Sequence, residues 1–149
     1  IGNSQDTRYD SDIFSCDVAT FCSHLTFYKK YFKIITVAEL SRIIELNEPI
    51  DEKLAVLTFD DGYIDNFEAA YQVLKKRGVT AVFFVPTSYI GSSILPWWDE
   101  IAWMIRNTKR DSVLIEPWEN EIRIDRGDMN ATIRSILLRV KRMEHIPME

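Results

Sequence analysis

The first part of the chain shows two amphipathic patterns separated by a short apolar stretch. Apolar residues recur at three- and four-residue steps after Asp17, which predicts a helix with one buried face. These residues are Val18, Phe21, Cys22, Leu25, Tyr28 and Phe32. A strand is expected at 32–35. Thr36 and Glu39 then have the spacing of a capping box, which predicts a second helix ending before Pro49. Its inward positions are predicted to be Val37, Leu40, Ile43 and Ile44.

Two longer apolar runs flank a third helical pattern. Residues 54–59 and 80–85 are almost continuously apolar, as in parallel strands that are covered on both faces. The segment between them has acidic residues in its first turn, basic residues in its last turn and Gly78 as a stop signal. Its apolar side is Phe67, Ala70, Tyr71 and Leu74. Strand, helix and strand with short connections predict a right-handed βαβ unit in a parallel sheet or barrel.

The second half of the chain has a different pattern. Residues 97–107 predict a helix that is apolar almost all round and therefore needs cover on several sides. Residues 113–116 and 121–125 predict a hairpin, with Pro117 and Asn120 in its turn. A last amphipathic helix is expected from about residue 128. Its inward positions are Ile133, Ile136, Leu137 and Val140.

Length and composition limit the class of protein. The 149 residues are 46% hydrophobic and 12% aromatic, and they contain no repeat or linker, which predicts a single domain over residues 1–149. The net charge of -5 is spread along the chain without a Lys/Arg-rich block, so nucleic acid is not an expected partner. No apolar run is long enough to predict a membrane span. The first residues do not resemble a signal peptide. The chain begins without Met, in a polar stretch that resembles the middle of a loop, so we expect the natural protein to extend upstream.

The cysteines and histidines give no recognisable metal motif. Cys16 and Cys22 are six positions apart on a predicted helix, which places them on different faces and favours free, buried or half-buried thiols. His24 and His145 are isolated, and neither has a familiar zinc-ligand spacing. We interpret both histidines as surface or capping residues.

Chemistry concentrates in the sequence Thr-Phe-Asp-Asp-Gly at residues 58–62. Barrel and open α/β enzymes place reactive groups at the carboxyl ends of buried strands, which is where Asp60 and Asp61 are expected. Two adjacent carboxylates repel, so both stay ionised most easily if one binds a cation and the other handles protons. The alternative is structural, because Asp-Asp-Gly is also common turn chemistry and an Asp can cap a helix.

Residues 54–86, LAVLTFDDGYIDNFEAAYQVLKKRGVTAVFFVP, resemble the first signature block of the polysaccharide deacetylases, the NodB-homology group that forms carbohydrate esterase family 4. A fainter similarity covers residues 18–46 and 87–103, where the Trp-Trp-Asp run is similar to a longer-loop branch of the group. The resemblance implies an α/β fold, a partial (β/α) barrel of the NodB type. The hairpin and final helix of the second half would be an insertion in it.

The resemblance also implies a reaction. Asp60 corresponds to the catalytic base, and Asp61 corresponds to a ligand of a divalent metal, usually zinc. The implied enzyme is a hydrolase of carbon–nitrogen bonds that removes acetyl groups from N-acetylated sugars of a polysaccharide. The metal would activate a water molecule from which Asp60 removes a proton. Many relatives act at the cell envelope, which is a tendency of the family and not a feature of these residues.

One part of the family pattern is missing. Relatives complete the metal site with two histidines in an H-(S/T)-x-x-H-P block, whereas His24 and His145 stand in other contexts. We expect the chain to be an N-terminal fragment of a complete enzyme, inactive by itself and prone to self-association, because the family barrel needs more βα units. The alternative is a pseudo-deacetylase that has lost its metal and serves as a carbohydrate-binding or scaffolding module.

Two further features have more than one interpretation. Trp97, Trp98 and Trp103 could form a platform for sugar rings, but core residues or cover for another segment are favoured. Trp118 is the better candidate for exposure. Acidic pairs also occur in phosphate-signalling receiver domains, but those need a further Asp and a Lys at later strand ends, and we identify neither here.

Overall fold

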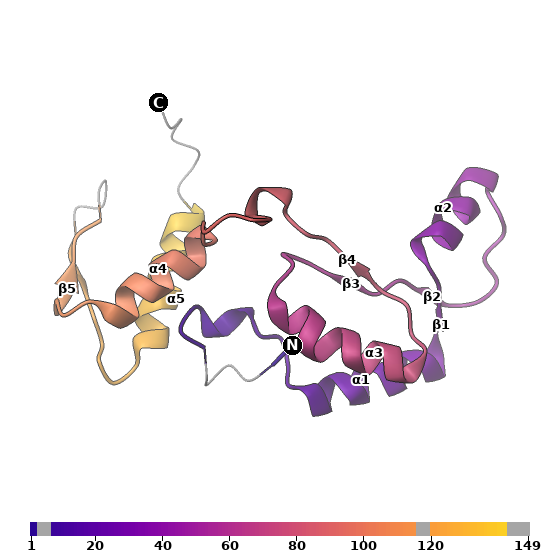
Figure 1. The fold of residues 1–149 in the computed structure, drawn as a ribbon, viewed down its shortest axis with the longest axis horizontal. Coiled ribbons are helices and arrows are strands. Elements are labelled where there is room, and N and C mark those ends of the chain that lie inside the picture. The colour runs from indigo at the N-terminus through magenta and orange to yellow at the C-terminus, as the bar shows by residue number, and fades with distance from the viewer. Residues whose placement is uncertain (3–6, 116–119, 143–149) are drawn as a thin grey trace. The chain divides into compact units, whose positions relative to one another are not determined.

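The computed structural model describes residues 1–2, 7–115 and 120–142. The chain divides into two compact units. The first unit contains residues 1–3 and 14–92, and the second contains residues 4–13 and 93–149. Each unit mixes helices with two-stranded sheets (Figure 1). That all 149 residues form one incomplete domain stays a prediction.

The first helix begins where the sequence predicts. Asp17 caps α1 (Val18–Tyr31), because its carboxylate Oδ1 accepts a hydrogen bond from the Thr20 backbone N–H at 2.7 Å. The predicted inward face is only partly buried. Phe21 and Leu25 are buried, Cys22 and Phe32 are half-buried, and Val18 and Tyr28 are exposed. The prediction was therefore wrong for Val18 and Tyr28. Both cysteines are free and half-buried, as predicted, although Cys16 precedes α1 and so does not share a helix with Cys22.

The second helix has well-defined caps at both ends. At the start of α2 (Val37–Leu46), the Thr36 hydroxyl accepts from the Glu39 N–H at 3.1 Å, and the Glu39 carboxylate accepts from the Thr36 N–H at 2.8 Å. This is the predicted capping box. Asn47 ends the helix in the left-handed conformation, with φ of 49°. No residue of α2 is buried, so the predicted inward face was wrong for the exposed Val37 and Ile44.

Parallel strands form the centre of the first unit. The strand β1 (Lys33–Ile34) pairs in parallel with β2 (Leu54–Ala55), and β3 (Thr58–Phe59) pairs in parallel with β4 (Val82–Phe83). These pairings confirm that the three predicted strands are parallel neighbours, although the predicted strand 54–59 is divided into β2 and β3. The structure shows small parallel sheets with helices, and a (β/α) barrel is not shown.

A helical segment connects β3 to β4. It contains a π-helical stretch, η2 (Asn66–Tyr71), followed by α3 (Gln72–Arg77) and ended by Gly78 with φ of 61°. Ala70 and Leu74 are buried, as predicted, whereas the prediction was wrong for Phe67 and Tyr71 of the same face, which are exposed. The core of the first unit is completed by aromatic contacts, in which Phe59 stacks on Phe83 with ring centroids 4.9 Å apart. The buried members of this core are Phe21, Leu25, Ala70 and Leu74. A short 3-10 turn, η3 (Thr87–Tyr89), follows β4.

The second unit is built on two helices and a hairpin. It contains α4 (Trp97–Asn107), the antiparallel pair β5 (Ser112–Val113) and β6 (Ile122–Arg123), and α5 (Met129–Arg142). The hairpin is confirmed, and Pro117 of its predicted turn lies outside the described residues. The core contains the predicted face of α5. Its buried residues are Ala102, Ile105, Ile122, Ile124, Ile133, Ile136 and Leu137, with Val140 packed against them.

An N-terminal strap, residues 9–12, is fixed to this second unit by polar contacts. Arg106 Nε donates to the Tyr9 carbonyl at 3.0 Å. The Asp10 N–H donates to Asp99 Oδ1 at 3.3 Å, and the Asp99 side chain is almost fully buried. Arg134 donates two hydrogen bonds to the Asp12 carboxylate, at 2.6 and 3.1 Å. The 3-10 turn η1 (Ser11–Ile13) overlaps the end of the strap.

Across the ranges that the structure describes, no helix combines the length and the apolar character that a membrane span requires.

Candidate functional site

The two acidic residues of the predicted site follow β3 directly. Asp60 and Asp61 are exposed to solvent, so both carboxylates are accessible to a ligand. The Gly62 N–H donates to the Asp60 carbonyl at 2.9 Å, which closes a three-residue turn with Asp61 at its centre. Asp61 has φ of 66°, an uncommon value for a residue with a side chain. We call residues 60–62 the acid turn.

Asn66 holds the acid turn from the start of η2. Its Nδ2 donates to the Asp60 carbonyl at 3.0 Å, and the residue is only 9% exposed. Its backbone N–H donates to the Tyr63 carbonyl at 3.0 Å. Asn66 was not among the site residues predicted from the sequence. The available signal was an amide side chain four positions after Gly62, where the helix begins.

Gly62 is required for two separate reasons. Its φ of 62° lies in the left-handed region that glycine adopts without strain. In addition, a Cβ placed on Gly62 would lie 3.0 Å from Cγ1 and 3.3 Å from Cγ2 of Val85. The sequence predicted the sharp turn, whereas the close approach of Val85 depends on the pairing of β3 with β4.

A mainly apolar hollow of about 230 Å³ lies beside the acid turn. The rings of Phe67 and Tyr71 in its wall are stacked, with centroids 5.5 Å apart and planes 10° apart. Its lining residues are Gly62, Tyr63, Asn66, Phe67, Tyr71, Phe83 and Val85. Flat aromatic walls suit apolar faces of a ligand, such as the C–H face of a sugar ring.

The donor set for a zinc ion is incomplete in the described part of the chain. Zinc sites in enzymes generally use three protein ligands. Asp60 and Asp61 offer carboxylate oxygens, but no three His, Cys, Asp or Glu residues gather within residues 1–2, 7–115 and 120–142. His24 lies on an exposed position of α1, as predicted for a surface residue, and His145 lies outside the described residues. These residues do not by themselves fit a zinc centre.

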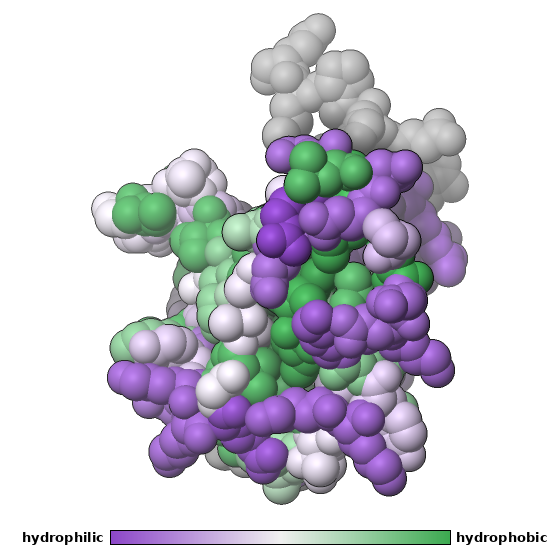
Figure 2. Space-filling model, turned by 90° about the vertical axis from the view of Figure 1, so that its right-hand side faces the viewer, coloured by the Kyte–Doolittle hydropathy of each residue, from purple (hydrophilic) through white to green (hydrophobic). Residues whose placement is uncertain are grey.

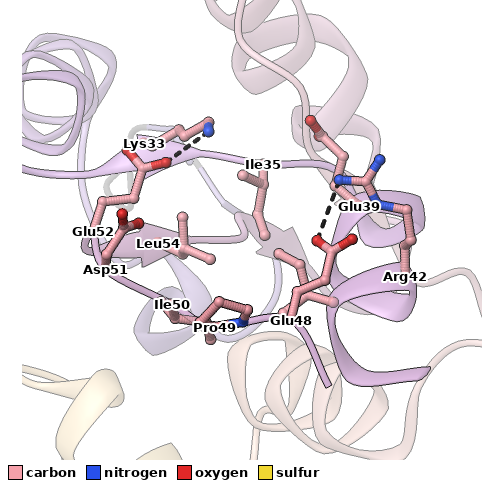
Figure 3. Close-up of a pocket in the computed structure, with 11 residues that line it drawn as sticks. Lys33, Ile35, Glu39, Arg42, Glu48, Pro49, Ile50, Asp51, Glu52 and Leu54 are labelled. Carbon is pink, nitrogen blue, oxygen red and sulfur yellow. Dashed lines mark hydrogen bonds and ion pairs between the residues drawn. The ribbon is translucent and has the colours of Figure 1, made fainter. Parts of the chain in front are cut away.

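A different pocket, of about 130 Å³, lies where β1 and β2 begin (Figure 3). Two ion pairs lie in its wall. Lys33 Nζ is 2.6 Å from Glu52 Oε1, and Arg42 Nη2 is 3.4 Å from Glu48 Oε2. The hydrogen bond with Glu52 raises the pKa of Lys33. Parallel-strand enzymes place chemistry at the carboxyl ends of strands, whereas this pocket is lined mainly by α2 and by the connection from α2 to β2. We therefore interpret it as a structural feature of the connection between α2 and β2.

The tryptophans of α4 have different environments. Trp98 packs against the core of the second unit, whereas Trp97 and Trp103 are exposed. The rings of Trp97 and Trp98 meet edge to face, with an interplanar angle of 84°. This pair therefore does not present one flat surface to a sugar. Trp118 lies outside the described residues.

Comparison with known proteins finds similarity around the acid turn. Residues 47–110 match the family described as Polysaccharide deacetylase. A Bacillus subtilis (strain 168) protein named "Putative polysaccharide deacetylase YxkH" is 41% identical over 63 residues. The aligned segment covers 42% of this chain and 21% of the relative. No solved structure matches the chain significantly. The segment that matches the family, residues 47–110, includes Asp60, Asp61, Gly62 and Asn66.

Proposed function

Because residues 47–110 match the polysaccharide deacetylase family, we propose that the chain supplies the carboxylate part of a site that removes acetyl groups from a glycan. The observation that carries this proposal is the position of the acid turn. Asp60 and Asp61 lie within the matched segment, directly after a parallel strand, and both are exposed. The proposed substrate is an N-acetylated sugar of a polysaccharide or oligosaccharide.

Asp60 is the proposed general base. Its carboxylate takes a proton from a water molecule, and the resulting hydroxide adds to the acetyl carbonyl carbon. The carbon–nitrogen bond then breaks, acetate leaves, and the sugar nitrogen takes up a proton to become an amine. The exposure of Asp60 supports this role, because both water and a large glycan can reach it.

Asp61 is the proposed ligand of a divalent metal, with zinc the first candidate. The metal would supply Lewis-acid polarisation of the substrate. Since the described residues offer only two neighbouring carboxylates at this place, further ligands must come from elsewhere. The two histidines of the family pattern are the groups that we expect to fill this role.

A second candidate function is carbohydrate binding without catalysis. It is favoured by the aromatic hollow beside the acid turn, which provides contact area for a sugar without any metal. In that case Asp60 and Asp61 would accept hydrogen bonds from sugar hydroxyls.

Acetate release from N-acetylated oligosaccharides tests the proposal. The 149-residue chain should release none with added zinc, because Asp61 is its one proposed metal ligand and a zinc site in an enzyme generally takes three protein ligands. A longer form that also carries the histidine pair should be active, and Asp60→Asn or Asp61→Asn should each abolish its activity. Asp51→Asn is the matched control, since Asp51 is an exposed carboxylate at the other end of the strands.

The possible results separate the two candidate functions. Zinc-dependent release by the short chain would show that its own residues complete the site. An inert longer form that still binds acetylated glycans would favour the non-catalytic module.

A further inference from the structure

We propose that Asn66 is a positioning residue that keeps the acid turn in its active shape, a role that rests on the deacetylase function proposed above. Asn66 is not itself expected to touch the substrate. It acts through the Asp60 backbone, whose carbonyl accepts its Nδ2–H at 3.0 Å.

The Asp60 carbonyl receives two hydrogen bonds at once. Gly62 donates its backbone N–H at 2.9 Å, from within the turn, and Asn66 donates its side-chain N–H from η2. Asn66 is only 9% exposed, so a side-chain amide that lost this partner would have little water to replace it. The bond therefore resists opening and ties the end of β3 to the start of η2.

The acid turn needs such support because its backbone is strained. A three-residue turn with a positive φ at its centre is rare, and Asp61 adopts φ of 66° without being glycine. Strained backbone of this kind persists only where its surroundings fix it. Asn66 provides one such contact, and the π-helical stretch begins at the same residue. π-Helical turns are frequent at functional sites.

Asn107 provides a matched comparison within the same chain. Its Nδ2 also donates to a backbone carbonyl, that of Trp103, at 2.8 Å. That bond lies on the exposed surface of α4 and stays within one helix, so it holds no strained turn. Removing this amide should leave the acid turn unchanged.

Nuclear magnetic resonance of the 149-residue chain tests the proposal without any need for activity. The Asp61 backbone chemical shifts and its amide–Hα coupling report whether φ is positive. In Asn66→Ala, the ratio of left-handed to other Asp61 conformers should fall about five- to tenfold, as expected for one lost hydrogen bond. In Asn107→Ala this ratio of Asp61 conformers should be the same as in the parent chain. Unchanged Asp61 signals in Asn66→Ala would overturn the proposal.

A second variant covers the case in which Asn66→Ala does not fold. Asn66→Asp keeps the size of the side chain and replaces the N–H donor with an acceptor when ionised. The same fall in the left-handed ratio is expected, and the amide of the buried Leu74 should keep its protection from hydrogen exchange. A folded Asn66→Asp chain with native Asp61 signals would refute the positioning role.

Kinetics of an active longer form separate this inference from the proposed function. Both Asn66 variants should lower kcat about tenfold or more with little change in KM, because the reacting carboxylate is misplaced while the sugar contacts remain. Asn107→Ala should leave both constants unchanged. If the unsubstituted longer form is inert but substitution of Asn66 still changes the Asp61 signals, the deacetylase function fails. The structural link between Asn66 and the acid turn then stands. A fall in kcat without any change at Asp61 would reject positioning.

Discussion

Gly62 and Val85 approach so closely that a Cβ on Gly62 would lie 3.0 Å from Val85 Cγ1. Gly62 closes the acid turn after β3, and Val85 follows β4. The packing of β4 therefore limits which residue the acid turn can carry. A candidate site built this way depends on the correct pairing of two strands that are distant in sequence.

Gly62→Ala should cost more stability than Gly78→Ala. Both glycines have a positive φ near 60°, but a Cβ on Gly78 would meet nothing within 4 Å. Gly78→Ala should lower the free energy of unfolding by about 1–2 kcal/mol, from backbone strain alone. Gly62→Ala should cost about 1–3 kcal/mol more, because its methyl group also collides with Val85. Urea denaturation measures both values, and equal costs would contradict the crowding argument.

In the second unit, two leucine-sized residues of α5 should respond very differently to truncation. Ile136 is 0% exposed in the core, whereas Leu138 is 48% exposed on the same helix. Ile136→Ala should lower the free energy of unfolding by about 2–5 kcal/mol, from lost burial and the cavity left behind. Leu138→Ala should change it by only about 0.5 kcal/mol. Similar losses in the two variants, measured by urea or thermal denaturation, would mean that α5 packs through another face.

The Asp12–Arg134 ion pair should make stability depend on acid pH. The two hydrogen bonds from Arg134 lower the pKa of Asp12 below its ordinary value. A lowered pKa means that the stabilisation is fully present above the ordinary carboxylate pKa and is lost as the pH falls through the lowered value. In a titration followed by nuclear magnetic resonance, Arg134→Gln should raise the pKa of Asp12.

Asp17 is the internal control for that titration. Its pKa is also lowered, but the cause is the hydrogen bond from Thr20 at the start of α1. Arg134→Gln should leave the pKa of Asp17 unchanged. If the pKa of Asp12 is the same in Arg134→Gln as in the parent chain, the ion pair does not form in solution.

The exposed apolar residues of the first unit should cause self-association. Ile44, Leu46 and Ile50 are each more than 60% exposed, and apolar groups lie open among polar ones on the side where α2 lies (Figure 2). Exposed apolar clusters of soluble proteins are usually covered by a partner surface. Light scattering should show a mass above that of a monomer, and the double variant Ile44→Ser with Leu46→Ser should reduce it.

Ser41→Ala on the same helix is the control for this experiment, since Ser41 is exposed but polar. It should associate as the parent chain does. If the unsubstituted chain stays monomeric at high concentration, the exposed apolar residues of α2 do not cause self-association.

The parts of the fold that follow from local signals could be predicted from the sequence. The capping box at Thr36 and Glu39 fixes the start of α2, and Gly78 fixes the end of α3, since each acts within about one helical turn. The parallel neighbours also followed, because a short strand–helix–strand connection has few alternatives. The exposure of Ile44 could not be predicted. A periodic apolar face shows that burial of that face would be favourable, but it does not show whether another element packs against it.

The acid pair was predicted as the candidate site, but the residue that holds it was not. Asp60 and Asp61 stand out because adjacent carboxylates after a buried strand are chemically unusual. Asn66 is polar at the start of a helix, where such residues are common for reasons unrelated to function. Its importance comes from one hydrogen bond to a backbone carbonyl, and a backbone acceptor leaves no trace in the sequence.

The N-terminal strap also affects the order in which the protein can fold during synthesis. Asp12 leaves the ribosome 122 residues before its partner Arg134. The first unit has all of its residues by position 92, so it can fold while the second is still being translated. The strap cannot form its contacts until α4 and α5 have been synthesised. Closing so long a loop carries a larger entropic cost than the local pairings of the first unit. We expect the second unit to complete its structure last, with the early-synthesised strap exposed to chaperones and proteases until then.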